Sequence, residues 1–528
     1  MSAAPPRTPA RPPALADLPA SPAGTAGSPW RLRVGLAAFC ALLSLGGIAG
    51  KSLTYHDETR VAGIAREMAL EGEYALPRLN GALFLEYPPL GYLPLAALFR
   101  LGAPPNDFLM LLPSAIAGLL TVFLTYRIGR RMGGERAGLV SALVLQCTFG
   151  FLALNARALV DPLLVFWITA ALCGFVGALE QPQRRGRCLA LFYAGLAGGF
   201  LTKGLIGLGV PCAVAFAYTL AARRTREIPR IALHGAVALL LVPVASWLWA
   251  AGLGGGDEIG VEIWRQSVWR FFSDSADHSK PLHFYLDRIS YLLAPAVVLL
   301  PWLLWDALAP KARRLVRSSR PLDALPAIWF LVVLGVLSLA SAKRNVYLGP
   351  IYPAFALMVG TWWARARAQP PNVRPWRWLA AAMPRSDAGC SLALALYALA
   401  YLGYAIGVER PYSIEHDTRP LFEDAARLRD ATGGSLVLLN PREAIQGAAV
   451  YYLGETLPVA WDAGWRDALG RAEGDSLLLG REEFVEPVVA ALGETRARLL
   501  ARHEFAGKVY EIALVRGHAR RGAGAPAD

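Results

Sequence analysis

Asp57 and Glu58 are adjacent carboxylates in the segment Tyr55-His-Asp-Glu-Thr-Arg60, directly after an apolar stretch at 30–50. That stretch is long enough to cross a bilayer, so both carboxylates are expected at a membrane face. A carboxylate in this place can act as a general base, although a solvated acidic turn has the same pattern. The placement of the other charged residues decides between the two interpretations.

Further polar residues stand at the ends of other apolar runs, where multi-helix membrane proteins often carry functional groups. They are Arg60, Glu86, Arg157, Asp161, Lys203, Arg270, His278, Lys343 and Arg344. Lys203 lies between two otherwise continuous apolar runs, and burial of its ammonium group is costly without an anionic partner. For each cation taken singly, the alternative is a side chain that only extends to the membrane interface.

For three of these residues, the neighbouring sequence allows a structural as well as a functional interpretation. Glu86 opens the segment Glu86-Tyr-Pro-Pro89, whose prolines stiffen the backbone, and a structural turn is the alternative there. Asp161 precedes a proline at the start of an apolar run, so a helix N-cap would explain it without chemistry. His278 lies in the long loop 252–288, where it either binds a divalent metal ion together with Glu86 or is simply solvated.

The composition is that of a membrane protein. Of the 528 residues, 55% are hydrophobic and only 18% are charged, and the mean hydropathy is +0.37, which excludes an ordinary soluble globular protein. The six cysteines lie in or beside apolar runs without metal-ligand spacing, so neither a zinc site nor a disulfide framework is expected. The net charge of +13 is spread in short clusters between apolar runs, a pattern that indicates membrane topology and not nucleic-acid binding.

Apolar runs of spanning or near-spanning length predict a polytopic α-helical membrane protein with about 11–13 spans. The runs lie at about 30–50, 109–126, 137–154, 160–179, 188–202, 204–221, 231–251, 289–306, 324–341, 346–364 and 388–407. A further run at 90–102 is too short to cross alone and is expected to be re-entrant or interfacial. Residues 1–29 are rich in Pro, Ala and Ser and are expected to form a disordered tail before an uncleaved first span.

The connections between the runs fall into two sets of different charge. The set 1–33, 127–136, 180–187, 222–230, 307–320 and 365–387 contains 25 Lys/Arg and 5 Asp/Glu. The set 51–89, 103–108, 155–161, 203, 252–288 and 342–345 contains 12 Lys/Arg and 14 Asp/Glu. The positive-inside rule places the first set in the cytoplasm and the second outside, so all the polar residues named above share the outer face.

Residues 408–528 are predicted to form a small extracytoplasmic α/β domain with a disordered tail, after a transmembrane domain at 30–407 with outer loops at 51–108 and 252–288. Segments 435–440 and 476–480 read as short buried strands, and 442–453 and 482–492 have helical spacing. No phosphate-binding glycine loop is present, so no nucleotide cofactor is expected.

Carboxylates and cations together on an external membrane face favour transfer of a group that arrives already activated on a lipid, because nucleotide sugars and ATP are not supplied there. A sugar on a polyprenyl phosphate fits: Arg and Lys stabilise the leaving phosphate, and a carboxylate accepts the proton of a lipid or glycan acceptor. A lipid-linked sugar transporter is the alternative from another class, but transporters hold such charges near the midplane and show repeated halves. A structural scaffold would leave Lys203 and the outer carboxylates unexplained.

An ordered set of segments resembles the bacterial GT-C glycosyltransferases, in particular the lipid A aminoarabinose transferases and their protein O-mannosyltransferase-like relatives. The segments are Asp57-Glu-Thr-Arg60, Ala65-Arg-Glu-Met68, Pro77-Arg-Leu-Asn-Gly81, Glu86-Tyr-Pro-Pro-Leu-Gly91, Arg157-Ala-Leu-Val-Asp161, Leu201-Thr-Lys-Gly204 and the stretch from Arg270 through His278 to Tyr285. The resemblance covers about residues 30–365. It implies a multi-pass enzyme of the bacterial inner membrane with a polyprenyl-phosphate sugar donor and a periplasmic active site.

The resemblance also implies roles for single residues. Asp57 matches the essential acidic residue after the first span, and Glu86 and His278 match metal or polar-head contacts. The residues expected to bind substrate are Glu58, Arg60, Tyr87, Arg157, Asp161, Lys203, Arg270, Lys343, Arg344 and Tyr347. Tyr87 departs from the pattern, because aminoarabinose transferases usually read Glu-Lys-Pro-Pro there, and this departure weakens the assignment to aminoarabinose and lipid A.

Overall fold

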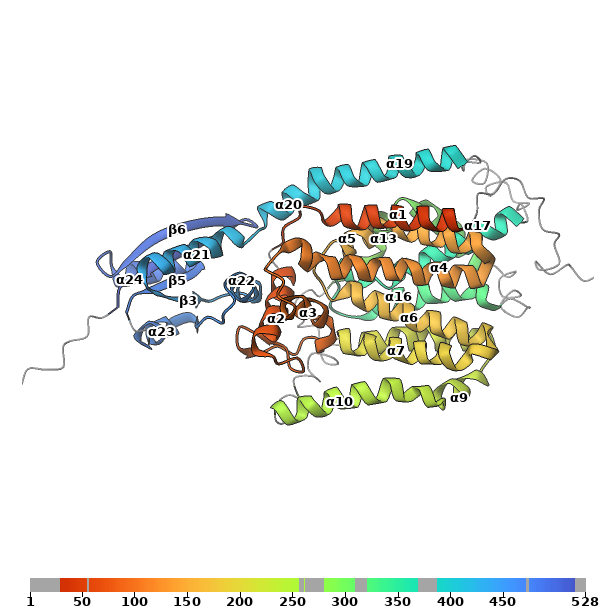
Figure 1. Ribbon diagram of the computed structural model, residues 1–528, viewed down its shortest axis with the longest axis horizontal. Helices are drawn as coiled ribbons and strands as arrows, with labels where there is room; N and C mark the ends of the chain where they lie inside the picture. Colours follow the sequence, from red (N-terminus) through yellow and green to blue (C-terminus); the bar gives the residue numbers. More distant parts are fainter. Residues whose placement is uncertain are drawn as a thin grey trace, which may run out of the picture.

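The computed structural model describes residues 29–54, 57–255, 261, 280–308, 321–368, 387–471 and 474–517. A bundle of long helices forms the larger part, and a small domain with a β-sheet lies beyond one end of it (Figure 1). Short helices stand between the two. Arg270, His278 and the tail 1–28 lie outside the described residues, so the predictions for them stay predictions.

The bundle consists of helices that contain each of the expected apolar runs. They are α1 (Pro29–Ile48), α4 (Asp107–Gln146), α5 (Phe149–Asn155), α6 (Asp161–Glu180), α7 (Arg185–Lys203), α8 (Leu205–Ala221), α9 (Glu227–Ala232), α10 (Ala238–Gly255), α13 (Phe284–Leu292), α14 (Leu300–Leu308), α16 (Leu325–Leu339), α17 (Ile351–Ala368) and α19 (Asp387–Tyr404). Among the described residues, six helical segments are long and apolar enough to cross a membrane, or seven if the bent pair α13 and α14 counts as one span. The protein is therefore a multi-pass membrane protein, as its composition predicts.

Helix α4 is a helical hairpin and supplies two of the expected runs. Its backbone leaves the helical region at Gly133 and at Gly134, which has φ 81°. The two arms run antiparallel in close contact, because a Cβ atom at Gly138 would lie 2.7 Å from the carbonyl oxygen of Tyr126, and one at Gly129 would lie 3.1 Å from the carbonyl oxygen of Ala137. The glycines thus provide both the turn and the room for the arms to pack.

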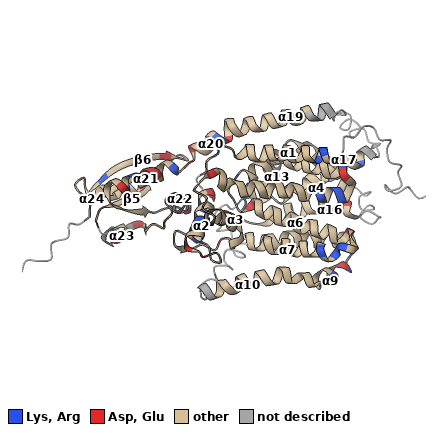
Figure 2. Cartoon of the chain, in the orientation of Figure 1, with Lys and Arg blue, Asp and Glu red and all other residues tan. Residues whose placement is uncertain are grey.

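The two sets of connections lie at opposite ends of the bundle. Figure 2 shows Lys and Arg gathered at the end formed by α9, the start of α7 and the end of α17. Ion pairs at this end include Arg33–Glu135, Arg185–Glu227 and Arg365–Asp306. The end with mixed charge faces the sheet domain. This separation agrees with the charge count, and it brings the predicted site residues to one end.

The outer loop between α1 and α4 folds into a compact layer. It contains α2 (Asp57–Glu71), a hairpin of β1 (Arg78–Leu79) and β2 (Ala82–Leu83), the 3-10 turn Pro89–Gly91 and α3 (Leu93–Arg100). Eight residues of helix rise only about 12 Å, so α3 cannot cross a bilayer. The prediction that the run at 90–102 is not a full span is consistent with this length.

The C-terminal domain has the predicted α/β class. Its helices are α20 (Arg410–Glu415), α21 (Arg419–Thr432), α22 (Glu443–Leu453), α23 (Trp465–Arg471) and α24 (Glu482–Leu492), and its strands are β3 (Ser435–Leu439), β4 (Val459–Ala460), β5 (Ser476–Arg481), β6 (Ala497–Phe505) and β7 (Lys508–Val515). The strand order is β4-β3-β5-β7-β6, in which β3 pairs in parallel with β4 and β5, and β7 pairs antiparallel with β5 and β6. Helical backbone continues from α19 through 405–415, so α20 joins the last helix of the bundle to this domain.

Candidate functional site

Asp57 is the first residue of α2, and both of its carboxylate oxygens contact guanidinium groups. Arg60, one turn further along α2, donates to Oδ1 at 3.0 Å, and Arg344, from the turn before α17, donates to Oδ2. Burial alone would raise the pKa of Asp57, but the charges of Arg60 and Arg344 outweigh it and hold this pKa below its ordinary value. Asp57 is therefore a carboxylate, and not a carboxylic acid, at neutral pH.

Arg60 joins three acidic side chains from different parts of the chain. Besides Asp57, its Nη1 atom lies 3.1 Å from Oε2 of Glu86 and also donates to Glu443 of the C-terminal domain. Burial tends to lower the pKa of Arg60, but Glu86 and Asp57 raise it above its ordinary value, so the guanidinium group stays charged. The guanidinium also lies 5.3 Å from the ring centre of Phe84. One buried cation thus links the outer loop to the neighbouring domain.

Lys203 ends α7 and has the anionic partner that its burial requires. Its Nζ atom lies 2.7 Å from Oδ1 of Asp161 and 4.9 and 4.7 Å from the ring centres of Tyr87 and Tyr347. The chain can leave α7 abruptly because Gly204 has φ 63°. Two aromatic rings and one carboxylate therefore fix the ammonium group in place.

Asp161 is not the N-cap that its position before a proline allows. Val160 occupies the cap position of α6, and no side chain caps this end of the helix. The carboxylate of Asp161 instead pairs with Lys203, which in turn is close enough to lower the pKa of Asp57. The structure thus brings seven predicted residues together: Asp57, Arg60, Glu86, Tyr87, Asp161, Lys203 and Arg344, with Tyr347 beside them.

Two residues predicted to bind substrate, Glu58 and Lys343, are buried and bonded to neighbouring parts of the chain. Glu58 is 1% exposed, and its Oε2 atom accepts hydrogen bonds of 2.7 Å from both the backbone N–H and the hydroxyl of Thr54. Lys343 is buried and donates to the backbone carbonyls of Lys280 and Ala340. Both polar heads thus make contacts within the protein, and substrate binding by either residue stays a prediction.

Arg157 stands apart from this cluster, whereas Glu86 of the predicted metal pair belongs to it. Arg157 is half-buried between α5 and α6 and makes no ion pair with any residue in the described ranges. Glu86 lies against Arg60. Because His278 is outside the described residues, a metal ion held by Glu86 and His278 stays a prediction.

Contacts of the C-terminal domain with the site were not predicted. Helix α22 crosses α2 so closely that a Cβ atom at Gly447 would lie 2.5 Å from the Cα of Arg60. The hydroxyl of Thr59 donates to the carbonyl of Ala444 at 3.0 Å. Only the acidic start of 442–453 in the sequence hinted that Glu443 could meet a cation.

A second set of contacts anchors the C-terminal domain at the start of α4. Asp107 accepts hydrogen bonds from Arg419 and, at 3.1 Å, from the hydroxyl of Tyr451. Tyr451 also belongs to the apolar core that fills the outer loop, together with residues of α2 and α3. The outer loop and the C-terminal domain therefore share one core.

Comparison with known proteins agrees with this geometry. Residues 86–249 match the family described as dolichyl-phosphate-mannose-protein mannosyltransferase. The undecaprenyl phosphate-alpha-4-amino-4-deoxy-L-arabinose arabinosyl transferase of Pseudomonas paraeruginosa is 32% identical over 364 residues, which are 68% of this chain and 62% of the relative. A second arabinosyl transferase, from Proteus mirabilis, is 30% identical over 61% of this chain and 58% of its own length. The chain thus spans about three fifths of these relatives.

Solved structures show the same fold. The structure of ArnT from Cupriavidus metallidurans bound to undecaprenyl phosphate has a TM-score of 0.71 at 17% identity and covers 92% of this chain and 98% of its own. An oligosaccharyltransferase from Archaeoglobus fulgidus has a TM-score of 0.50 at 12% identity, over 81% of this chain and 63% of its own. The chain is thus similar in sequence to these arabinosyl transferases and shares the fold of ArnT.

Proposed function

We propose that the protein is an inner-membrane glycosyltransferase that moves a sugar from a polyprenyl phosphate to an acceptor on the periplasmic side. The observation that carries this proposal is the contact of Asp57 with two guanidinium groups, beside the ammonium group of Lys203. The charge count puts this end of the bundle outside and the N-terminus in the cytoplasm. The similarity to arabinosyl transferases that are named for an undecaprenyl phosphate donor supports the same class of donor.

The cations of the site have the chemistry that a departing phosphate needs. As the bond between the anomeric carbon and the phosphate oxygen breaks, both bonding electrons stay with the phosphate and its negative charge grows. Arg344 is the most accessible cation of the cluster, with a side chain 31% exposed, whereas those of Lys203 and Arg60 are 9% and 10% exposed. Arg344 is therefore our candidate for direct contact with the phosphate, and Lys203 and Arg60 support it from within.

Asp57 serves as the general base in the proposed reaction. The acceptor hydroxyl attacks the anomeric carbon from the face opposite the phosphate, its proton passes to Asp57, and the configuration of that carbon inverts. In the free protein Arg60 and Arg344 lower the pKa of Asp57 and make it a weak base. An anionic phosphate on Arg344 offsets this positive charge, so donor binding raises the pKa of Asp57 and strengthens the base.

For donor and acceptor, we propose 4-amino-4-deoxy-L-arabinose and lipid A. The named activity of the curated relatives supports the sugar. Tyr87 replaces the lysine usual in that family, and its ring lies 4.9 Å from the ammonium group of Lys203. A cation from α7 is thus kept beside the position of the missing lysine. Transfer of mannose to protein is the alternative within the superfamily.

The test compares Asp57→Asn with Glu71→Gln, which neutralises an exposed carboxylate at the other end of α2. Both are purified in detergent and supplied with radiolabelled polyprenyl-phosphate aminoarabinose and lipid A. We expect Asp57→Asn to lose transfer by roughly 100-fold or more, the scale of a general base. Glu71→Gln should keep the rate.

The same assay separates the enzyme from a transporter. A transferase releases free polyprenyl phosphate in step with labelled acceptor, whereas a transporter in vesicles moves the intact lipid-linked sugar across the bilayer. Normal transfer by Asp57→Asn would contradict the assignment of the base. Translocation of the donor without release of phosphate would contradict the proposed function itself.

A further inference from the structure

Glu511 is a buried acidic residue in the middle of β7 of the C-terminal domain. It is 1% exposed, and neither of its carboxylate oxygens has a hydrogen-bond partner among the described residues. A buried carboxylate without a partner costs several kcal/mol, on the order given for uncompensated buried charges. A bound cation or a proton must therefore compensate its charge.

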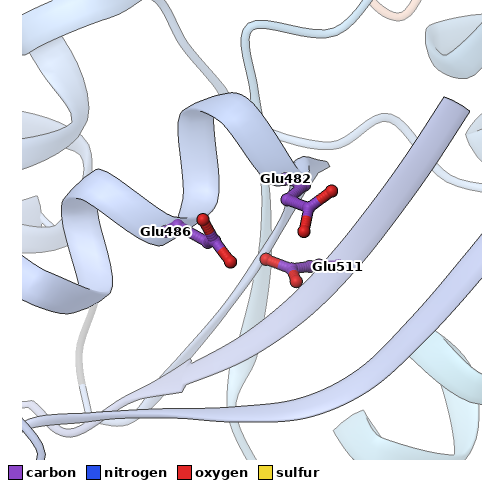
Figure 3. Close-up of side chains that lie close together, drawn as sticks. All are labelled: Glu482, Glu486 and Glu511. Atoms are coloured by element: carbon purple, nitrogen blue, oxygen red, sulfur yellow. The ribbon is translucent and has the colours of Figure 1, made fainter.

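Two more carboxylates converge on Glu511. Glu482 and Glu486 lie one turn apart on α24, and one oxygen from each of the three residues lies within 4.8 Å of the others. Figure 3 shows the carboxylate of Glu511 pointing into the space between the other two. Arg502, opposite Glu511 in the β6–β7 register, donates to Glu482 at 2.6 Å. The cluster thus carries three negative charges and one positive charge when all four groups are ionised.

The separation of the oxygens fits a calcium-sized ion. Two ligand oxygens that each lie about 2.4 Å from one Ca²⁺ are at most about 4.8 Å apart, and the three carboxylates satisfy this bound. Mg²⁺ demands near-octahedral geometry and usually keeps several waters, so a cluster of three protein carboxylates is a more typical set of ligands for Ca²⁺. An excess of two negative charges also equals the charge of the ion.

We propose that Glu482, Glu486 and Glu511 bind a divalent cation of the calcium type. The ion satisfies the buried carboxylate and ties the first turns of α24 to β7. The site is independent of the proposed sugar transfer, because none of its residues contributes to the cluster around Asp57. An affinity in the range of about 10⁻⁴ to 10⁻³ M is expected, as in other extracellular calcium sites.

The experiment measures binding of ⁴⁵Ca²⁺ to the full-length protein in detergent after removal of bound metal with a chelator. We expect one ion per chain, retained in excess Mg²⁺ and lost in Glu511→Gln. Thermal unfolding of the same samples gives a second reading. Without calcium, Glu511→Gln should be at least as stable as the unchanged protein, because the substitution relieves repulsion among the carboxylates. With calcium, the order should reverse.

Two matched variants assign the ion to this cluster. Glu494→Gln changes an exposed glutamate just beyond α24 and should bind calcium normally. Glu86→Gln alters the other predicted metal position and should also keep this ion. The proposal is overturned if the unchanged protein binds no calcium, or if Glu511→Gln and Glu486→Gln both bind it as before. Protonation of Glu511 would then explain the cluster, because burial and its two acidic neighbours raise its pKa.

Discussion

At the scale of single residues, the carboxylates of the site share a small number of cations. Arg60 is shared among Asp57, Glu86 and Glu443, whereas Arg344 forms an ion pair only with Asp57 among the described residues. Arg344 is also half-exposed, so a bound phosphate can draw it away from Asp57 without breaking the buried network. The basicity of Asp57 is therefore tied to one accessible guanidinium group.

Replacing Arg344 by Gln should change both the rate and its pH dependence. Loss of a charged hydrogen bond costs about 1.5–3 kcal/mol, so kcat/KM should fall by roughly 10- to 100-fold. Arg344 lowers the pKa of Asp57, and its removal raises that pKa. Because the free enzyme needs ionised Asp57, the acid limb of the kcat/KM profile should move to higher pH.

The pH dependence of kcat/KM tests the effect of Arg344 on Asp57. Arg344→Lys keeps a positive charge and should restore much of the acid limb, although a single ammonium group replaces the guanidinium fork less well. Arg100→Gln removes an exposed cation at the end of α3 and should leave the profile unchanged. An Arg344→Gln profile with an unshifted acid limb would show that Arg344 does not tune Asp57.

At the scale of elements, α2 is positioned by the C-terminal domain as much as by the bundle. Glu67 accepts the backbone N–H groups of Asn80 and Gly81, which fixes the β1–β2 turn against α2. The side chain of Asn80 then makes two hydrogen bonds with the backbone of Leu457. The segment 77–81, noted in the sequence as part of a family pattern, is thus a docking contact and not a substrate contact.

Replacing Gly447 by Ala tests this positioning. The new Cβ atom would lie 2.5 Å from the Cα of Arg60 and 2.7 Å from the carbonyl oxygen of Thr59, so the two helices must separate. Overpacking of this kind costs about 1–3 kcal/mol, and it moves the start of α2 that carries Asp57. We expect a lower midpoint of thermal unfolding and a loss of transfer larger than the loss of folded protein.

Gly464→Ala is the matched control for Gly447→Ala. Gly464 lies in the same domain, and a Cβ atom there would meet nothing within 4 Å. Its stability and transfer rate should equal those of the unchanged protein. Equal behaviour of the two alanine variants would mean that the contact between α2 and α22 does not control the site.

At the same scale, the sequence predicts helices and buried strands better than the contacts between them. Apolar runs locate the bundle helices, and β3 and β5 stand out because both of their faces are buried. The hairpin β6–β7 was not predicted, because β6 is half-exposed along most of its length and carries charges among its apolar residues. The Asp161–Lys203 ion pair could be predicted from the sequence, because a buried ammonium group needs an anionic partner. The contact of Glu443 with Arg60 could not be predicted from the sequence, because the two residues are 383 positions apart.

At the scale of the whole molecule, the C-terminal domain covers the end of the bundle that carries Asp57. Figure 1 shows α22 beside α2 and α3, between the sheet and the helices of the bundle. Tyr451 lies in the apolar core that the C-terminal domain shares with α2 and α3, and Arg419 contacts Asp107 at the start of α4. These contacts hold the C-terminal domain against the bundle. The domain is therefore part of the wall around Asp57, and its removal would expose apolar surface of the outer loop.

A chain that ends at residue 418 should insert into the membrane but fail in transfer. It loses the pairing of Glu443 with Arg60 and uncovers the buried face of α2, so Asp57 is no longer held in place. A chain that ends at 517 keeps every described contact and serves as the control. We expect the first to transfer sugar at less than a tenth of the control rate, because the loss of one charged contact of about 1.5–3 kcal/mol already has this effect. Binding of radiolabelled donor is then measured for both chains. This measurement distinguishes loss of the donor site from loss of folded protein. Transfer by the shorter chain at the control rate would contradict the structural role of the domain, whereas retained donor binding without transfer would place that role in the orientation of α2.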